Sequence, residues 1–81
     1  MSTPRKDTQF LHDIAQKLKD LRNKRGLSQL RVTMDTGVNV GRAESGTRSS
    51  SAYSVALLCK YYGVSLEDFY KGVDIELIPW E

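Results

Sequence analysis

Residues 36–48 carry side chains that are well suited to bind a nucleic acid. Arg42 has a guanidinium whose two donors match the O6 and N7 acceptors of guanine, and the Asn39 amide matches adenine. Thr36 could contact a phosphate or a thymine methyl group, and Val38 could contact a thymine methyl group. Each of these assignments has an alternative. Arg42 could bind phosphate alone, Asn39 and Thr36 could act as helix caps, and Val38 could be a core residue. The stretch therefore predicts double-stranded DNA as a partner.

Polar residues on either side of this stretch extend the predicted contact. Ser28 caps a helix and Gln29 opens it, and backbone amides at such a helix start can hold a phosphate together with an amide side chain. Gln29 could instead be a plain exposed helix residue. Thr47 and Arg48 begin a polar loop that continues as Ser49–Ser51, so we predict backbone phosphate contacts there as well.

Catalysis and metal binding are disfavoured. The chain has one histidine, His12, and one cysteine, Cys59, and neither has a partner in the sequence that would make a nucleophile–base pair or a structural zinc site. We therefore expect no enzyme activity, no cofactor, no metal and no small-molecule ligand. A single cysteine cannot form an intrachain disulfide, which favours a reducing, cytoplasmic compartment.

Length and composition indicate one small globular domain. The chain has 81 residues, of which 40% are hydrophobic, and no apolar run reaches the ~20 residues of a membrane span. The N-terminus lacks the apolar stretch of a signal peptide. The net charge of +2 is uneven: residues 1–25 carry a balance of +4, residues 26–60 carry +2, and residues 61–81 carry −4. A basic first part suits one face toward phosphate.

The elements that must position these residues are predicted as five helices between a frayed segment, 1–7, and a tail, 73–81, with the domain at 8–72. Apolar spacing, polar caps and glycine stops set their limits. We expect Val32 in the core, with Met34 beside it. The predicted helices run from Asp7 or Thr8 to Gly26, from Ser28 to the turn at Thr36-Gly37, over about 37–45 to Gly46, from Ser50 or Ser51 to Gly63, and from Ser65 to Gly72.

Three short patterns in order resemble the Xre/Cro-type helix-turn-helix family, the lambda repressor-like DNA-binding domains. They are Ser28-Gln29, the series Val40, Arg42, Ala43, Glu44 and Gly46, and the run from Gly63 to Asp68. The resemblance covers roughly residues 10–70. It implies an all-α, five-helix lambda-repressor-like domain whose recognition helix, at about 37–45, enters the major groove. This chain is about three residues shorter than the family pattern between Val32 and Val40, which predicts a shortened second helix or turn.

The resemblance also implies a structural ion pair. In the family, an acid at the position of Glu44 commonly pairs with an arginine near the end of the first helix, and Arg22 stands at that place. An acid facing DNA would be repelled by phosphate. We therefore predict that Arg22 and Glu44 join the recognition helix to the first helix.

The tail has a different pattern. Val73, Ile75 and Leu77 alternate with two acids, a period of two that predicts a short C-terminal β-strand, and Trp80 could anchor a contact. A lone strand suggests that two tails pair across a two-fold axis in a homodimer. The function predicted is sequence-specific DNA binding by a small dimeric transcriptional regulator. The alternative is an antitoxin-like or controller-like protein whose tail binds a protein partner.

Overall fold

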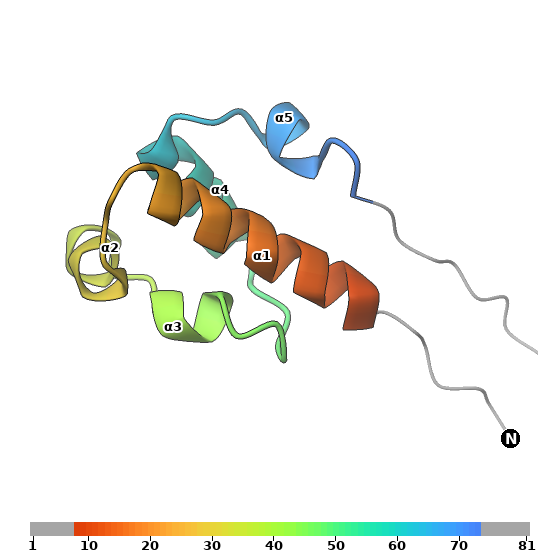
Figure 1. Cartoon of the computed structure of the whole chain (residues 1–81), viewed down its shortest axis with the longest axis horizontal. Helices are drawn as coiled ribbons and strands as arrows, with labels where there is room; N and C mark the ends of the chain where they lie inside the picture. The colour runs from red at the N-terminus through yellow and green to blue at the C-terminus, as the bar shows by residue number, and fades with distance from the viewer. Residues whose placement is uncertain (1–7, 74–81) are drawn as a thin grey trace, which may run out of the picture.

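A long helix, α1 (Thr8–Lys24), forms one side of the domain, and four shorter helices pack around it (Figure 1). The computed structural model describes residues 8–73. Ile14, Ala15 and Leu18 are buried on one face of α1, as their helical spacing predicts. Gly26 then adopts a left-handed φ of 65°, which ends the helix and turns the chain toward the second helix.

The second and third helices form a compact corner. α2 (Gln29–Thr36) begins at the cap Ser28, whose side chain accepts a hydrogen bond from the Arg31 amide, and ends at Gly37 with a φ of 79°. α3 (Val40–Ala43) begins at the cap Asn39. The Thr33 hydroxyl accepts a hydrogen bond from the Val40 amide at 3.2 Å, so the start of α3 is tied to α2.

The third helix, α3, is shorter than predicted. The expectation of a helix over about 37–45 is wrong at its start, because Gly37, Val38 and Asn39 form a turn and only four residues are helical. The missing residues were expected to shorten the second helix or the turn. In the structure α2 has eight residues, Gly37–Asn39 separate it from α3, and α3 has four residues.

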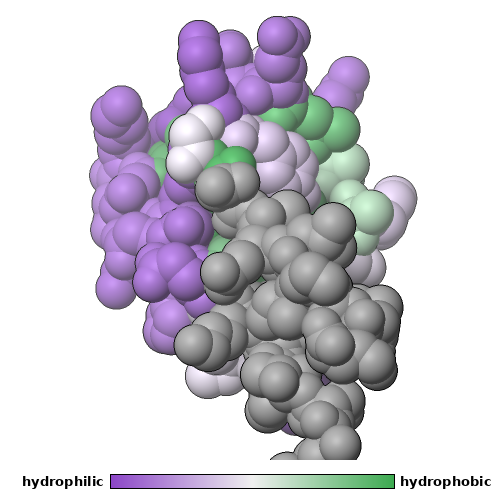
Figure 2. Space-filling view, turned by 90° about the vertical axis from the view of Figure 1, so that its right-hand side faces the viewer, coloured by the Kyte–Doolittle hydropathy of each residue, from purple (hydrophilic) through white to green (hydrophobic). Residues whose placement is uncertain are grey.

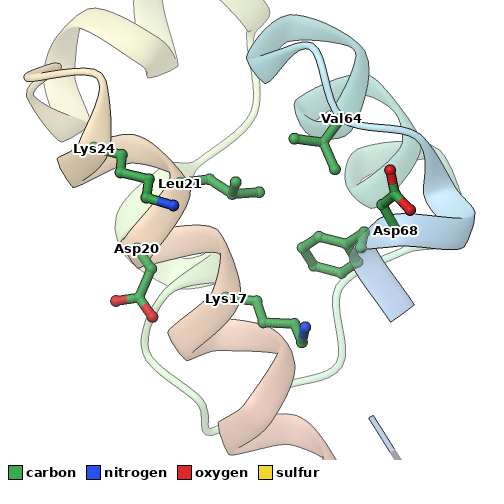
Figure 3. Close-up of a pocket in the computed structure, with 7 residues that line it drawn as sticks. Lys17, Asp20, Leu21, Lys24, Val64 and Asp68 are labelled. Atoms are coloured by element: carbon green, nitrogen blue, oxygen red, sulfur yellow. The ribbon is translucent and has the colours of Figure 1, made fainter. Parts of the chain in front are cut away.

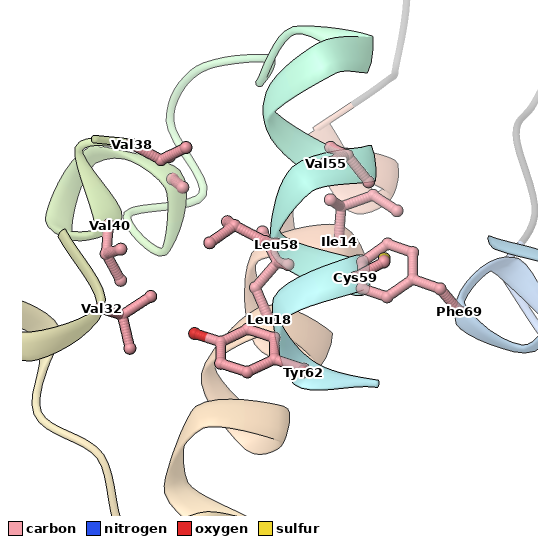
Figure 4. Close-up of a cluster of buried hydrophobic side chains, with 11 residues drawn as sticks. Ile14, Leu18, Val32, Val38, Val40, Val55, Leu58, Cys59, Tyr62 and Phe69 are labelled. Atoms are coloured by element: carbon pink, nitrogen blue, oxygen red, sulfur yellow. The ribbon is translucent and has the colours of Figure 1, made fainter. Parts of the chain in front are cut away.

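The last two helices close the core. α4 (Ala52–Tyr62) is capped by Ser51, one of the two predicted serines, and α5 (Leu66–Tyr70) is capped by Ser65. Leu18, Leu58 and Val32 meet at the centre of the domain from three different helices (Figure 4). Met34, which was expected beside Val32, is 74% exposed, because it points outward from α2.

The predicted C-terminal strand lies largely outside the described residues. Of the tail, only Val73 is described: its amide donates to the Tyr70 carbonyl, and its side chain packs against the core. Ile75, Leu77, Trp80 and residues 1–7 also lie outside. Within residues 8–73 there is no strand, and none of the helices combines the length and apolar character needed to cross a bilayer. The end face in Figure 2 shows mainly hydrophilic surface with small hydrophobic patches.

Candidate nucleic-acid interface

The predicted ion pair between Arg22 and Glu44 is present and nearly buried. Arg22 Nε lies 2.7 Å from Glu44 Oε2, and Arg22 Nη2 donates to Glu44 Oε1 at 2.9 Å. The two side chains are 11% and 3% exposed. Arg22 Nη1 also donates to the Leu27 carbonyl at 2.8 Å. Hydrogen bonding to the carboxylate raises the pKa of Arg22, so the guanidinium stays charged.

Gln29 joins α2 to this pair. Its Nε2 donates to Glu44 Oε1 at 3.0 Å, so α1, α2 and the end of α3 converge on one carboxylate. Gln29 was predicted as a phosphate contact, and the structure gives it this internal partner while leaving the residue exposed. A methyl group added at Gly41 would lie 3.4 Å from Gln29 Oε1, an ordinary contact, so α3 and the Gln29 side chain lie close together there.

The short helix α3 has one buried and one exposed side. Val40 and Ala43 face the core, whereas Asn39, Gly41 and Arg42 are exposed. Asn39 Oδ1 accepts a hydrogen bond from the Arg42 amide at 3.0 Å, so its predicted alternative as a cap is confirmed. The cap leaves the Asn39 amino group free to donate outward. Within the part of the chain that the structure describes, the Arg42 guanidinium has no hydrogen-bond partner, so its donors face solvent.

Two of the predicted DNA contacts serve the turn instead. The Thr36 hydroxyl donates to the Val32 carbonyl at 2.7 Å and accepts from the Val38 amide at 3.1 Å. Val38 is 9% exposed and belongs to the core, so the packing alternative is confirmed, although Val38 also lines the hollow beside Arg42. Both residues fix the angle between α2 and α3.

A hollow of about 270 Å³ lies between α3 and the start of α4. Arg42 and Asn39 line one side, and hydroxyl groups line the other. The hydroxyl residues are Ser49, Ser50, Ser51 and Ser54. Ser51 is occupied as a cap, because its Oγ accepts from the Ser54 amide at 3.0 Å. The sequence did not predict that the serine loop and Arg42 would face one hollow, since that depends on how the loop between α3 and α4 folds back toward α3.

The loop after α3 presents the remaining predicted residues. Thr47 and Arg48 are exposed, and the Thr47 amide and hydroxyl both lie near the Ser45 hydroxyl. Gly46 has a φ of 75°, and a methyl group added there would lie 3.0 Å from His12 Nδ1 on α1. The loop therefore packs closely on α1 while Arg48 stays exposed.

A second polar contact, which sequence reasoning missed, joins α2 to α4. Asp35 Oδ2 accepts from Arg31 Nε at 2.9 Å and from the Tyr61 hydroxyl at 2.5 Å. Both hydrogen bonds lower the pKa of Asp35, and the bond from Tyr61 has the larger effect. The four-residue spacing of Arg31 and Asp35 is a signal for the helical ion pair, but nothing in the sequence pointed to Tyr61.

The described residues hold no group of three or more histidine, cysteine or acidic side chains that could bind a metal ion. Cys59 is buried in the core, and burial raises the pKa of its thiol, which suits a packing role. Comparison of the sequence with protein-family models finds no matching family, and comparisons with curated proteins and with solved structures also find no match.

Proposed function

We infer that this protein binds double-stranded DNA sequence-specifically and acts as a small dimeric transcriptional regulator in the cytoplasm. One observation carries the inference: Glu44 is held by Arg22 and Gln29, and the same short helix presents to solvent the Arg42 guanidinium, which has no partner among residues 8–73. A rigidly anchored short helix with one exposed arginine is suited to the major groove, where arginine pairs with guanine. The Xre/Cro-like patterns in the sequence favour the same role.

The surroundings of α3 suit a phosphate backbone on either side of the groove. Arg48 and Thr47 lie exposed in the loop after α3, and Ser28 and Gln29 begin α2. The serine-lined hollow beside Arg42 adds hydroxyl donors. Such contacts hold the protein in register without reading sequence. Binding would therefore combine one base-reading arginine, and the Asn39 amino group, with several phosphate contacts.

Dimerisation would double the number of base contacts that one short helix can make. Val73, Ile75, Leu77 and Trp80 are the residues that we propose for the interface, with two tails pairing antiparallel across a two-fold axis. Such a dimer would place the two α3 helices about one DNA turn apart, roughly 34–36 Å.

The decisive experiment is selection of bound sequences from random double-stranded DNA, with the Arg42→Ala variant carried through in parallel. We expect the wild-type chain to enrich a two-fold symmetric site and the variant to lose preference at one base pair of each half. Recovery of no enriched sequence by the wild-type chain would overturn the proposed function.

A second candidate is an antitoxin-like or controller-like protein that binds a protein partner. Leu30 and Met34 favour it, because they lie on consecutive turns of α2 and are 68% and 74% exposed. Leu30→Ser together with Met34→Ser would separate the candidates. Loss of regulation in cells with unchanged DNA affinity supports a protein partner, and unchanged regulation counts against it.

A further inference from the structure

A groove runs between α1 and the α4–α5 pair, on a part of the molecule that the proposed DNA contact does not use. Its apolar floor is formed by Leu21, Val64 and Phe69. Leu21 and Val64 point into it from opposite sides (Figure 3). Its volume is about 220 Å³, below the roughly 300–1,000 Å³ of small-molecule pockets. The size therefore suits side chains of a polypeptide better than a cofactor.

Lysines edge the α1 side of this α1–α5 groove. Lys17 and Lys24 both line it, two turns apart on α1. Lys17 Nζ donates to the Lys71 carbonyl at 3.0 Å, which leaves the ammonium charged and with further donors. Asp20 also lines the groove, but its carboxylate accepts from Gln16 and lies on the outer side in Figure 3. Asp68 stands on the opposite side, so the positive edge is the α1 edge.

The C-terminal segment, residues 74–81, has the complementary chemistry. It contains three acids and no basic residue, and its acids alternate with the apolar residues Ile75 and Leu77. In an extended chain, alternate side chains point to opposite sides. Ile75 and Leu77 would then face the apolar floor, and Asp74 and Glu76 would stay at the rim, where long lysine side chains can reach them.

Geometry favours the groove of a second copy over the chain's own groove. The described chain ends at Val73, beyond the Lys17 end of the groove, so a segment entering its own groove would have to reverse at once. Asp74 is the single residue among 74–78 of a type that favours a turn, and no glycine, proline, asparagine or serine follows it there. Five extended residues span about 17 Å, enough to follow the groove of a directly abutting copy from Lys17 to Lys24, which lie about 11 Å apart along α1.

We propose that the α1–α5 groove binds residues 74–78 of a second copy of this chain, with Lys17 and Lys24 pairing with the acids of that segment. The inference rests on the dimer in the proposed function and deepens it. When two tails pair antiparallel and run past each other, the end of each tail lies over the other copy. Exchange of residues 74–78 between the copies and pairing of the tails therefore describe one dimer.

Charge reversal tests the pairing in the full-length chain. One variant carries Lys17→Glu and Lys24→Glu, and the other carries Asp74→Lys and Glu76→Lys. Sedimentation equilibrium should show each variant alone with a dimer dissociation constant at least tenfold weaker than that of the wild-type chain, because like charges then meet. An equimolar mixture of the two should recover dimer, as one heterodimer pairs reversed lysines with reversed acids.

A control variant with Lys19→Glu and Lys60→Glu makes the same change in net charge as the Lys17→Glu, Lys24→Glu variant, at two exposed positions that do not line the groove. It should dimerise like the wild-type chain, and circular dichroism should show all variants equally helical. A wild-type monomer, dimers of undiminished stability in both variants, or a mixture that stays monomeric would each overturn the inference. The sedimentation assay contains no DNA. If the DNA selection fails while the mixture of the two variants still recovers dimer, only the proposed regulator function is rejected.

Discussion

Arg22 and Glu44 are 22 residues apart in the sequence and form a bidentate ion pair that fixes the end of α3 against α1. Gln29 adds the start of α2 to the same carboxylate. The side chains that hold the helix-turn-helix corner are therefore separate from Arg42, which the corner presents. Stability and binding should respond to different substitutions.

Glu44→Gln should destabilise the fold. Removing one member of a buried pair leaves the other charge uncompensated, and the amide keeps only part of the hydrogen bonding, so we expect a loss of about 1–3 kcal/mol. Glu67→Gln, at an exposed acid in the first turn of α5, is the matched control. Thermal unfolding followed by circular dichroism measures both, and equal shifts in melting temperature would contradict a structural role for Glu44.

Tyr62 should make the fold sensitive to alkali. Its hydroxyl is buried without a partner among the described residues, and burial raises its pKa to about 12. The neutral phenol is favoured in the folded state, so its contribution to stability is complete below the ordinary pKa of 10 and is lost as the pH rises toward 12.

The Tyr62→Phe variant should match or exceed wild-type stability at neutral pH, because it removes an unpaired buried hydroxyl. It should also lose less stability between pH 10 and 12. Denaturant unfolding at several pH values tests this. Equal alkaline losses in the two proteins would assign the effect to another group.

Gly46→Ala should cost more stability than Gly26→Ala. Both glycines have positive φ, at 75° and 65°, so each substitution carries a backbone cost of about 1–2 kcal/mol. Only at Gly46 would the new methyl group press on His12, at 3.0 Å, while nothing lies within 4 Å of the one at Gly26. Adding His12→Ala should restore part of the difference in urea midpoints; no restoration would rule out the contact.

Arg42→Ala should change which DNA is bound. Losing a bidentate guanine contact costs about 1–3 kcal/mol and relaxes preference at that base pair alone. Competition binding against sites altered one base pair at a time gives the pattern. A uniform loss over all sites would make Arg42 a phosphate contact.

Arg48→Ala should weaken binding equally on all sequences. A phosphate contact releases about one counterion, so the slope of log affinity against log salt should fall by about 1. Lys60→Ala, at an exposed lysine on α4, serves as the comparison. An unchanged slope for Arg48→Ala would remove this residue from the interface.

Short-range chemistry explains which features could be predicted from the sequence. The caps Ser28 and Ser65 and the stops Gly26 and Gly63 depend on neighbouring residues alone, and all four are present. Arg22–Glu44 is a long-range pair, and only the family resemblance located it.

The features that were missed depend on packing between helices. Val38 and Met34 have similar apolar character, yet one is buried and the other exposed, because the direction of α2 against α4 decides which side faces inward. Tyr61 and Asp35 meet only after that packing is set. The start of α3 was placed too early because its limit was set by the turn at Thr36-Gly37, whereas the helix begins only after the cap at Asn39.

The single turn of α3 limits how much information one copy can draw from DNA. Arg42 and Asn39 are the two exposed side chains there that could each specify a base, so in the proposed DNA complex one copy would distinguish about two base pairs, or about four bits, by direct contact. Choosing one site among the roughly 10⁶–10⁹ of a genome needs about 20–30 bits. Even a dimer falls short, so the operators of such a protein should occur in clusters where several copies bind side by side.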